Sequence, residues 1–442
     1  MPSKDLYNRL KKEIDTVTVV DTHEHLYFPE EDYLALEPDF TQFLFQYNLD
    51  DLMSSGMEVP DVDGFSQSCG ETLAIDGQPL TPEQKWKHIK PHWENAKFTG
   101  YSRAVRHSLM MLFGIDDLTD TSYRKVTEQL RAIMKPGIYR KILSGICGFE
   151  TSINDVDTMV KPGAFERMDR DLFHFAARFR HFSYAYYPGG IQHLETMFER
   201  TIRTLGHIED ALDDQFERWM EEGRVAIKMG DAYLRDIHYE DSPREDAERV
   251  VRRCFTLQKH STYAETISFA EARPYENYIV HRVLDRAGEY NLPVIIHTGI
   301  QAFVRDELEH SRALLVTNLL RKYPNVRFHL LHASYPWMGE AACLAKQFPN
   351  VSVDLTWTQV IVPEGAREGL SHMLDMVPVN KIHCFGGDYM VPLNIWGALE
   401  VARENIAHVL AGKVETGHMT ETEAVEVAWK ILHHNARAIF GL

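Results

Sequence analysis

The 442-residue sequence predicts an α/β fold, a parallel (β/α)₈ or TIM barrel, from two observations. From about residue 190 onward, short β-branched runs alternate with long helical segments. Strands separated by single helices imply right-handed crossovers and a parallel sheet. With a strand near the amino end and two weaker candidates, the runs number eight, the strand count of this barrel. Since 44% of the residues are hydrophobic, we expect one large barrel domain over residues 1–442.

The first strand is an apolar run at residues 17–22, with valine on both of its faces. The strands that we predict after it are, in chain order, residues 144–150, 181–187, 224–229, 292–299, 325–333, 350–355 and 381–388. The first two of these seven are the weaker candidates. Helices between the later strands are predicted at residues 272–291, 307–324 and 339–349, each closed by Asn or Pro.

A long interval between the first two strands, residues 26–143, breaks this alternation. It contains helix-like pieces at residues 32–56 and 99–115 but no strand-rich run. We therefore expect a helical insertion on the first βα loop, over the active face of the barrel. Such an insertion could form a lid that contacts substrate. A second excursion, residues 231–250, is strongly charged, and we expect it to be a solvated loop and helix face.

Composition excludes several classes of function. The formal net charge is −18, and we find no basic stripe of the kind that binds a nucleic-acid backbone. The five cysteines lack Cys-x-x-Cys spacing, which argues against a disulfide framework or a cysteine zinc site and favours a reducing, cytoplasmic setting. No apolar run approaches ~18 residues, so we expect no spanning helix and no membrane partner. The amino terminus is amphipathic, with Leu6, Leu10 and Ile14 four residues apart, and does not resemble a signal peptide.

Two histidines separated by one residue, His23 and His25, follow the first strand. If the backbone stays extended, the period of 2 aims both imidazoles to the side that already holds Asp21, where they could share one ion. The competing interpretation is a pair of surface histidines in a loop, because short motifs carry a high false-positive risk. Residues elsewhere in the chain must decide between the two.

Four further ionisable residues lie at predicted strand ends, namely Lys228, His297, His332 and Asp388. The carboxyl ends of all barrel strands converge on one rim, so these residues and the two histidines are expected to be neighbours. Imidazoles with a carboxylate match the ligand set of a divalent cation, zinc first, with manganese or iron as alternatives. Satisfied core histidines are the alternative for His297 and His332.

Three of the rim positions leave choices open. Lys228 lies among apolar neighbours, where burial lowers a lysine pKa. It could be carboxylated and bridge two metals, or stay an amine that contacts an anionic substrate. The competing interpretation is that Lys228 extends to solvent or pairs with Asp231. Asp354 is the rival of Asp388, which we prefer because two glycines precede it. His329 points to the opposite face from His332 and is expected to be structural.

This constellation resembles that of the amidohydrolase superfamily of metal-dependent barrel enzymes. Residues 330–355, the run FGGDYMVP at 385–392 and the carboxyl-terminal HHNARAIFGL look like the amidohydrolase-2 branch. That branch includes decarboxylases, nodulin-type domains fused to glutamine synthetase and, more distantly, uronate isomerases. Residues 93–116 also look like the helical insertion of the last two groups.

The resemblance implies roles for the rim residues. His23, His25 and Asp388 would be metal ligands, His297 a further ligand, and His332 a second-metal ligand or catalytic acid/base. Lys228 matches the position of a carboxylated lysine in binuclear members, but several mononuclear relatives lack that modification, so one or two metals are expected. The surrounding arginine motifs differ from those of the uronate isomerases, which puts a transfer of isomerase activity in doubt.

The leading hypothesis is a metal-dependent hydrolase that cleaves an amide, ester or related bond of a small substrate through a metal-activated water. Asp388 would carry the proton, with His332 assisting. Arg103, Arg106 and Arg235 could bind a substrate carboxylate, although exposed charges are the commoner role for such arginines. The alternatives are a metal-dependent decarboxylase or sugar-acid isomerase, and a metal-stabilised binding protein. We expect a homo-oligomer joined through the outer helices. The substrate itself cannot be read from the sequence.

Overall fold

Eight parallel strands form one curved sheet with the order β1-β4-β5-β6-β7-β8-β9-β10, as predicted for the barrel. The computed structural model describes residues 2–26, 29–44, 46–58, 74–75, 78–155, 165–260, 266–302 and 306–442. Its barrel strands are β1 Val19–Glu24, β4 Phe149–Asp155, β5 Phe173–Arg178, β6 Arg224–Met229, β7 Val294–Ile296, β8 Phe328–Leu330, β9 Val351–Asp354 and β10 Ile382–His383. The segment after β10 closes the circle, because the N–H of Thr22 donates to Phe385 O (3.1 Å) and the N–H of Asp388 to His23 O (2.9 Å).

A small apolar cluster fills the lower barrel, with one buried side chain from most strands. Its members include Val20 of β1, Ile153 of β4 and Ile295 of β7. Helix α20, Asn435–Phe440, plugs the end of the barrel by packing Ile439 and Phe440 against these residues. The amino-terminal ends of the strands are thereby closed, and the polar residues at their carboxyl ends remain for chemistry.

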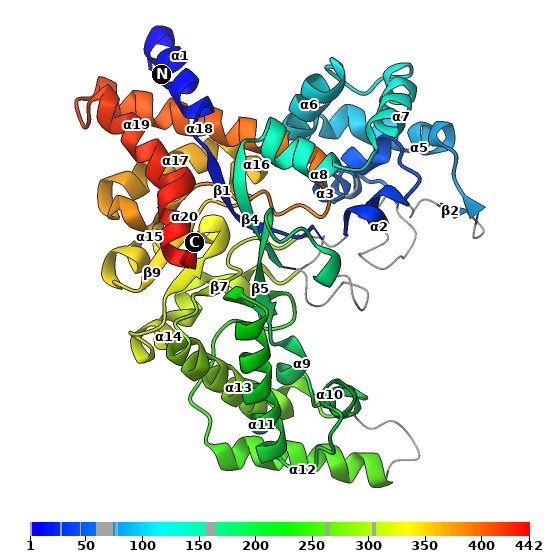
Figure 1. Cartoon of the computed structure of the whole chain (residues 1–442), viewed down its shortest axis with the longest axis vertical. Helices are drawn as coiled ribbons and strands as arrows, with labels where there is room; N and C mark the ends of the chain where they lie inside the picture. The colour runs from blue at the N-terminus through cyan, green and yellow to red at the C-terminus, as the bar shows by residue number, and fades with distance from the viewer. Residues whose placement is uncertain are drawn as a thin grey trace.

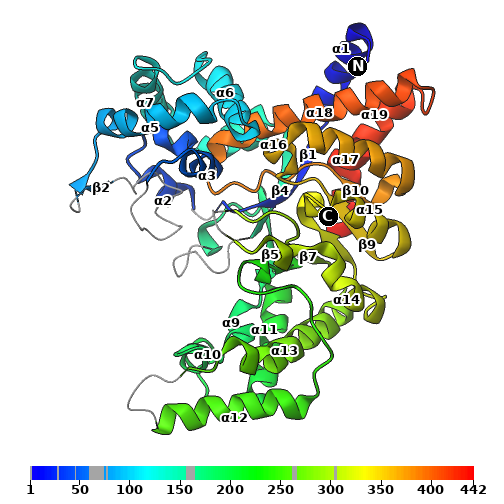
Figure 2. The same cartoon turned by 180° about the vertical axis from the view of Figure 1, so that it is seen from behind.

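Between β1 and β4 lie helices that form a separate group beside the barrel (Figures 1 and 2). They are α2 Glu30–Leu34, α3 Tyr47–Ser54, α5 Pro82–Ala96, α6 Gly100–Phe113, α7 Ser122–Ile133 and α8 Ile138–Arg140, with a hairpin of β2 Ala74–Ile75 and β3 Gln78–Pro79. Helix α6 packs closely on α18, Ile395–Glu415. A Cβ added at Gly397 of α18 would lie 1.8 Å from Ala104 O, so the two backbones can approach only because this residue is glycine.

Helices α10–α13 reach away from the barrel on the side opposite α5–α7 (Figure 1). The helices outside the β1–β4 interval are α1 Lys4–Asp15, α9 Arg180–Ser183, α10 Gly190–Phe198, α11 Leu205–Glu221, α12 Arg244–His260, α13 Phe269–Glu289, α14 Thr317–Lys322, α15 Met338–Gln347, α16 Thr358–Ile361, α17 Pro363–Met376, α18 and α20 as above, and α19 Glu421–Trp429. The predicted amphipathic helix at the amino end is α1, which buries Leu6, Leu10 and Ile14.

The two weaker strand predictions were wrong in position. Residues 141–146 form a π-helical turn, and only the end of the predicted 144–150 run enters β4. Strand β4 is rich in buried polar residues; the Asn154 side chain, for example, pairs with both backbone groups of Leu26. Its sequence therefore lacks the apolar signal of a buried strand.

The run predicted as a strand at 181–187 instead contributes to helix α9 and the turn after it. Its aromatic residues favour a strand by propensity, but tertiary contacts override that preference. Tyr275 Oη donates to Phe182 O (2.6 Å) and Tyr186 Oη donates to Glu276 (2.5 Å). The actual third strand is β5, eight residues earlier than the predicted start.

Two other expectations need correction. The predicted helix at 307–324 consists of two 3₁₀ turns followed by the short helix α14, because Arg312 is extended between them. The charged excursion 231–250 is not a purely solvated face. Its first part is buried, and Tyr239 Oη donates a 2.7 Å hydrogen bond to Asp231 inside it.

Candidate metal centre

His23 and His25 reach the rim because strand β1 departs from a regular ladder. Its pairing with β4 shifts register between Asp21 and Glu24. Thr22 points into the barrel, where its hydroxyl donates to Asp354 (2.5 Å). The Asp21 carboxylate instead accepts the backbone N–H of His23 (3.1 Å). The expected alternation therefore fails at this point, and Asp21 does not join the two imidazoles.

Asp388 is held opposite the two histidines by a strained turn. Its φ of +63° is in the left-handed region, which is uncommon for residues other than glycine and is found often at functional sites. Its backbone carbonyl accepts hydrogen bonds from Tyr47 Oη and from Gln46 Nε2 (2.8 Å), both from the segment between β1 and β4. The preceding glycine is required, since a Cβ at Gly387 would lie 2.1 Å from Glu24 Oε1.

The three side chains converge at one point, which we call the rim group (His23, His25 and Asp388). Asp388 Oδ1 lies 3.0 Å from His25 Nε2 and 3.3 Å from His23 Nε2. Each of the three offers one potential metal-ligand atom, and these atoms all lie within 4.8 Å of one another. His23 and Asp388 are buried and His25 is nearly so.

The rim group fits a divalent cation by its chemistry. Asp388 Oδ1 is buried and has no hydrogen-bond partner among the described residues, although two imidazole nitrogens approach it. A bound cation would satisfy all three atoms at once. Burial lowers the pKa of His23 well below its ordinary value, so the imidazole is neutral and its lone pair is available. Burial alone would raise the pKa of Asp388, but His25 and His332 hold it below the usual range, as an anionic ligand requires.

Lys228 lies beside this group at the end of β6. Its Nζ is 3.0 Å from His23 Nε2, and the side chain is only 3% exposed. Burial lowers its pKa to about 8. Lys228 neither extends to solvent nor pairs with Asp231, because its amine points to the rim group.

His297 and His332 form a second pair on the same rim. His332 Nε2 lies 3.0 Å from His297 Nδ1 and 3.8 Å from Asp388 Oδ2. The other ring nitrogens are oriented by backbone carbonyls, His332 by Thr356 O (3.0 Å) and His297 by Ile300 O (3.2 Å). Burial lowers the pKa of His332 to about 4 and that of His297 well below its ordinary value. Both rings are therefore neutral and fixed in orientation.

Asp354, the rival carboxylate, belongs to a separate cluster below the rim, which we call the internal cluster (Thr22, His329, Asp354 and His383). Asp354 accepts hydrogen bonds from Thr22, from His329 Nε2 (2.9 Å) and, through its other oxygen, from the Thr356 N–H (2.8 Å). The rings of His329 and His383 meet edge to face at 4.6 Å. Both oxygens of the Asp354 carboxylate accept hydrogen bonds from protein donors, as expected for a residue that stabilises the fold.

The structure does not bring the three predicted substrate arginines to the rim group. Both Arg103 and Arg106 lie on helix α6. Arg103 pairs with Glu404, and Arg106 donates to Asp116 O (2.8 Å). Arg235 is 1% exposed and forms an ion pair with Glu276 at 2.6 Å. It also donates to the carbonyls of Asp236 and His238 and to the Asn277 side chain, so it stabilises the fold around α13.

Sequence reasoning missed an arginine that does lie at the rim. Arg178 ends β5 and makes two hydrogen bonds to Asp155, one of them 2.6 Å long from Nε to Oδ1. Asp155 in turn accepts a 3.1 Å hydrogen bond from His25 Nδ1 at its backbone oxygen. The sequence does carry a signal for this residue, since Arg178 is a charged residue that follows an apolar run. Arg178 was missed because the third strand was predicted several residues too late.

Among the described residues, no helix combines the length and the apolar character needed to cross a lipid bilayer.

Comparisons with known proteins agree with this arrangement. The model of the amidohydrolase family matches residues 204–442, just over half of the chain. The protein fluG of Emericella nidulans is 29% identical over 231 residues, a match that covers 49% of this chain and 26% of that protein. This chain thus matches only about a quarter of the length of that relative.

Solved structures match over nearly the whole chain at low identity. Uronate isomerase from Thermotoga maritima matches with a TM-score of 0.78 at 15% identity, and the match covers 99% of this chain and 98% of the isomerase chain. Glucuronate isomerase from Caulobacter crescentus has a TM-score of 0.75 at 14% identity, with 99% and 94% covered. A putative metal-dependent hydrolase from Lactobacillus casei has a TM-score of 0.65 at 14% identity, with 98% and 97% covered. These likenesses show a shared fold.

A barrel whose carboxyl-terminal rim gathers histidines, a lysine and an aspartate defines a class, the barrel enzymes whose catalytic residues lie at strand ends. Within that class, this chain belongs to the amidohydrolase family. The resemblance stated from the sequence is confirmed.

Proposed function

We propose that this protein is a metal-dependent hydrolase that cleaves an amide, ester or related bond in a small, carboxylate-bearing substrate. The observation that carries the proposal is the convergence of two imidazoles and one carboxylate on a point where Asp388 Oδ1 has no hydrogen-bond partner among the described residues. A divalent cation, zinc first, suits this donor set. When bound, it would lower the pKa of a water ligand toward ~7 and polarise a carbonyl.

The residues around the rim group are suited to moving a proton. Asp388 presents Oδ1 to His23 and His25 while Oδ2 lies 3.8 Å from His332 Nε2. A carboxylate in that position can accept a proton from an attacking water at Oδ2 and deliver it to the leaving group. His332 donates its Nδ1–H to Thr356 O, so its neutral ring presents the lone pair of Nε2, which can accept a proton during the reaction.

Two cations support a substrate with a negative charge. Arg178 is linked to the rim group by Asp155, which accepts hydrogen bonds from both Arg178 and His25. Since its Nε and Nη2 already donate to Asp155, we propose that Arg178 attracts a substrate carboxylate through its charge. Lys228 is the second cation, and we propose that its amine orients the substrate or, if carboxylated, bridges two metal ions. Arg178 thereby takes the role that the sequence suggested for Arg103, Arg106 and Arg235.

The helices between β1 and β4 would complete the site. We propose that residues 26–143 are an insertion that covers the rim, because Gln46 and Tyr47 within it bind the backbone of Asp388. Tyr47 also lies against Trp357 at 4.6 Å between ring centroids, and Trp357 packs on His332. Excluding water in this way strengthens the electrostatic interactions inside a site.

A second candidate is a metal-dependent isomerisation or decarboxylation of a hydroxy acid. Each ring donates its other nitrogen to a backbone carbonyl, so His297 Nδ1 and His332 Nε2, 3.0 Å apart, both carry lone pairs. This pair favours the second candidate, because either nitrogen can take a proton from a substrate carbon and return it to a neighbouring one. The same ligands serve either reaction, since function depends on the site rather than on the fold.

Product analysis in ¹⁸O-labelled water separates the candidates. We would incubate the zinc-loaded protein with panels of N-acyl amino acids, lactones, hydroxybenzoates and uronates. Hydrolysis incorporates one ¹⁸O into a product carboxylate, decarboxylation releases carbon dioxide, and isomerisation conserves mass. The proposal predicts ¹⁸O incorporation by the wild type and its loss in Asp388→Asn. Turnover with conserved mass or carbon dioxide release would overturn the hydrolase assignment.

A further inference from the structure

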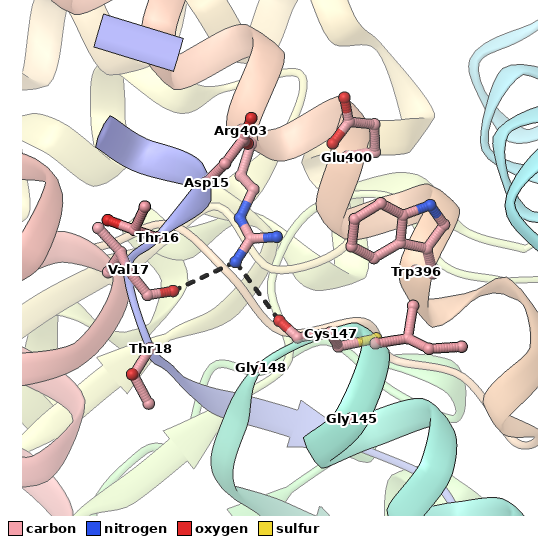
Figure 3. A pocket seen from close by; sticks show the side chains of 11 residues that line it. Asp15, Thr16, Val17, Thr18, Gly145, Cys147, Gly148, Trp396, Glu400 and Arg403 are labelled. Carbon is pink, nitrogen blue, oxygen red and sulfur yellow. Dashed lines mark hydrogen bonds between the residues drawn. The ribbon is translucent and has the colours of Figure 1, made fainter. Parts of the chain in front are cut away.

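A cavity of about 350 Å³ lies at the opposite end of the barrel from the rim group. Its walls come from the end of α1, the residues that precede β1 and β4, and one face of α18 (Figure 3). Helix α18 contributes Trp396, Glu400 and Arg403, which are spaced so that they share a helix face. The volume is within the range of small-molecule sites, roughly 300–1,000 Å³.

Arg403 forms the floor of this cavity and is 3% exposed. One of its terminal nitrogens, Nη2, donates to Val17 O (3.2 Å) and Cys147 O (3.4 Å), as Figure 3 shows. Its Nε has no hydrogen-bond partner among the described residues, and no described carboxylate lies within ion-pair distance of the guanidinium. A buried arginine normally has a paired anion, because an uncompensated buried charge costs several kcal/mol.

Two carboxylates lie at the mouth of the cavity. The Glu400 side chain is 21% exposed and that of Asp15 is 40% exposed. Lys11, which lies outside the lining, contacts both of them, at 2.9 Å and 2.6 Å respectively. The mouth thus carries one negative charge in excess of its lysine. The positive charge of Arg403 at the floor is attracted by Glu400 and Asp15 but makes no direct ion pair with either.

We propose that this cavity binds a small zwitterion of the α-amino acid type. Its carboxylate pairs with Arg403 at the floor, and its ammonium group faces Glu400 and Asp15 at the mouth. Lys11, Arg403 and the two carboxylates are together neutral, so a zwitterion keeps the balance, whereas a bare anion adds an uncompensated charge. Trp396, whose ring centroid is 6.0 Å from Arg403 Cζ, offers an apolar surface for the side chain of the ligand.

A purely structural role for Arg403 is the competing explanation, because it ties the segment before β1 to the segment before β4. That role uses only Nη2. It leaves the remaining donors of a buried guanidinium without a described acceptor, and it gives no reason for a cavity lined by opposite charges at its two ends. The two explanations differ in what they predict for ligand binding.

Calorimetric titration of the full-length protein tests the proposal. L-alanine, L-leucine and L-phenylalanine serve as zwitterions of three sizes. The tightest of the three is compared with its analogue lacking the amino group and its analogue lacking the carboxylate; for leucine these are 4-methylpentanoate and 3-methylbutylamine. We expect the amino acid to bind at least ~10-fold more tightly than either analogue, about 1.4 kcal/mol by the relation of affinity to free energy.

Variants locate the binding. Arg403→Met should abolish binding, and Glu400→Gln should weaken it about 10-fold, while Arg9→Met, a substitution of an exposed arginine on α1, should leave it unchanged. If Arg403→Met does not fold, a wild-type crystal soaked with the amino acid should show density between Arg403 and Glu400. Absence of binding by all three amino acids, unchanged affinity in Arg403→Met, or equal affinity for the analogue without its amino group would each overturn the proposal.

Discussion

Two groups of histidine and aspartate lie in the same barrel and contrast in how their carboxylates are satisfied. In the internal cluster, both oxygens of Asp354 accept hydrogen bonds from protein donors. In the rim group, Asp388 Oδ1 faces two imidazole nitrogens and has no hydrogen-bond partner among the described residues. Buried polar groups are normally paired, so an exception is evidence of a missing partner. From this contrast we propose that the internal cluster stabilises the barrel and that the rim group binds a ligand.

The largest expected effect is loss of metal from the rim group. His23→Ala or His25→Ala removes one of the three donors, and we expect the purified protein to lose its bound ion and its activity while its far-ultraviolet circular dichroism is unchanged. Metal content is measured by elemental analysis after zinc loading. The exposed His434 provides the control, since His434→Ala should retain full metal content. Normal metal content in both rim variants would place the ion elsewhere.

The internal cluster should respond in the opposite way. Asp354→Ala leaves Thr22, His329 and the Thr356 N–H without their acceptor in a buried setting. Each buried donor left without its acceptor costs about 1–3 kcal/mol, so we expect a loss of about 3–5 kcal/mol in the free energy of unfolding. The folded fraction should still bind metal. Chemical denaturation followed by metal analysis checks both points, and the contrast between the clusters fails if Asp354→Ala loses metal without losing stability.

Gly387→Ala tests whether close packing positions Asp388. The added Cβ would lie 2.1 Å from Oε1 of the buried Glu24, whose other oxygen, Oε2, accepts the Tyr389 N–H at 2.6 Å and so limits how far the carboxylate can move. We expect a cost of about 1–3 kcal/mol from overpacking together with weaker metal binding. At Gly412 in α18 a Cβ meets no atom within 4 Å, so Gly412→Ala should be neutral or stabilising by ~1 kcal/mol. Equal stability of the two variants in thermal denaturation would contradict the packing argument.

A smaller effect is expected from acid. Burial alone would raise the pKa of Asp354, but its hydrogen bond from His329 holds that pKa well below the ordinary value of 3.8. An aspartate with a depressed pKa stabilises the fold above its unfolded pKa, and this contribution is lost as pH falls below about 3.8. Wild-type stability should therefore decline in that range. Asp354→Asn should show a shallower decline, whereas Glu217→Gln, at an exposed position on α11, should follow the wild type. Identical slopes for Asp354→Asn and the wild type would contradict the assignment.

The parts of the fold that could be predicted were those with a simple apolar period. Strands β6 to β10 and helix α13 each carry a clear pattern, and the barrel followed from their alternation. Strand β4 could not be recognised, because it buries the polar residues Thr151, Ser152 and Asn154. The side chains of Thr151 and Asn154 bind distant backbone groups. Strand β5 was displaced by a nearby aromatic run that packs as a helix and turn.

The rim residues were accessible from sequence because strand ends in a barrel must meet at one edge. That rule brought His23, His25, Lys228, His297, His332 and Asp388 together without any knowledge of side-chain geometry. The choice of Asp388 over Asp354 needed more than the rule, since both follow a strand; the two glycines were the only sequence signal. The arginines could not be placed, because Arg235 and Arg103 are paired with carboxylates far away in the sequence.

The most direct test of the account is a crystal structure of the zinc-soaked protein with anomalous scattering recorded at the zinc edge. We predict an anomalous peak at the rim group, about 2.0–2.2 Å from His23 Nε2, His25 Nε2 and an Asp388 oxygen. The internal cluster should show none. A peak at Asp354 instead, or no peak near His23, His25 and Asp388 under saturating zinc, would contradict the claim that these residues form the metal centre.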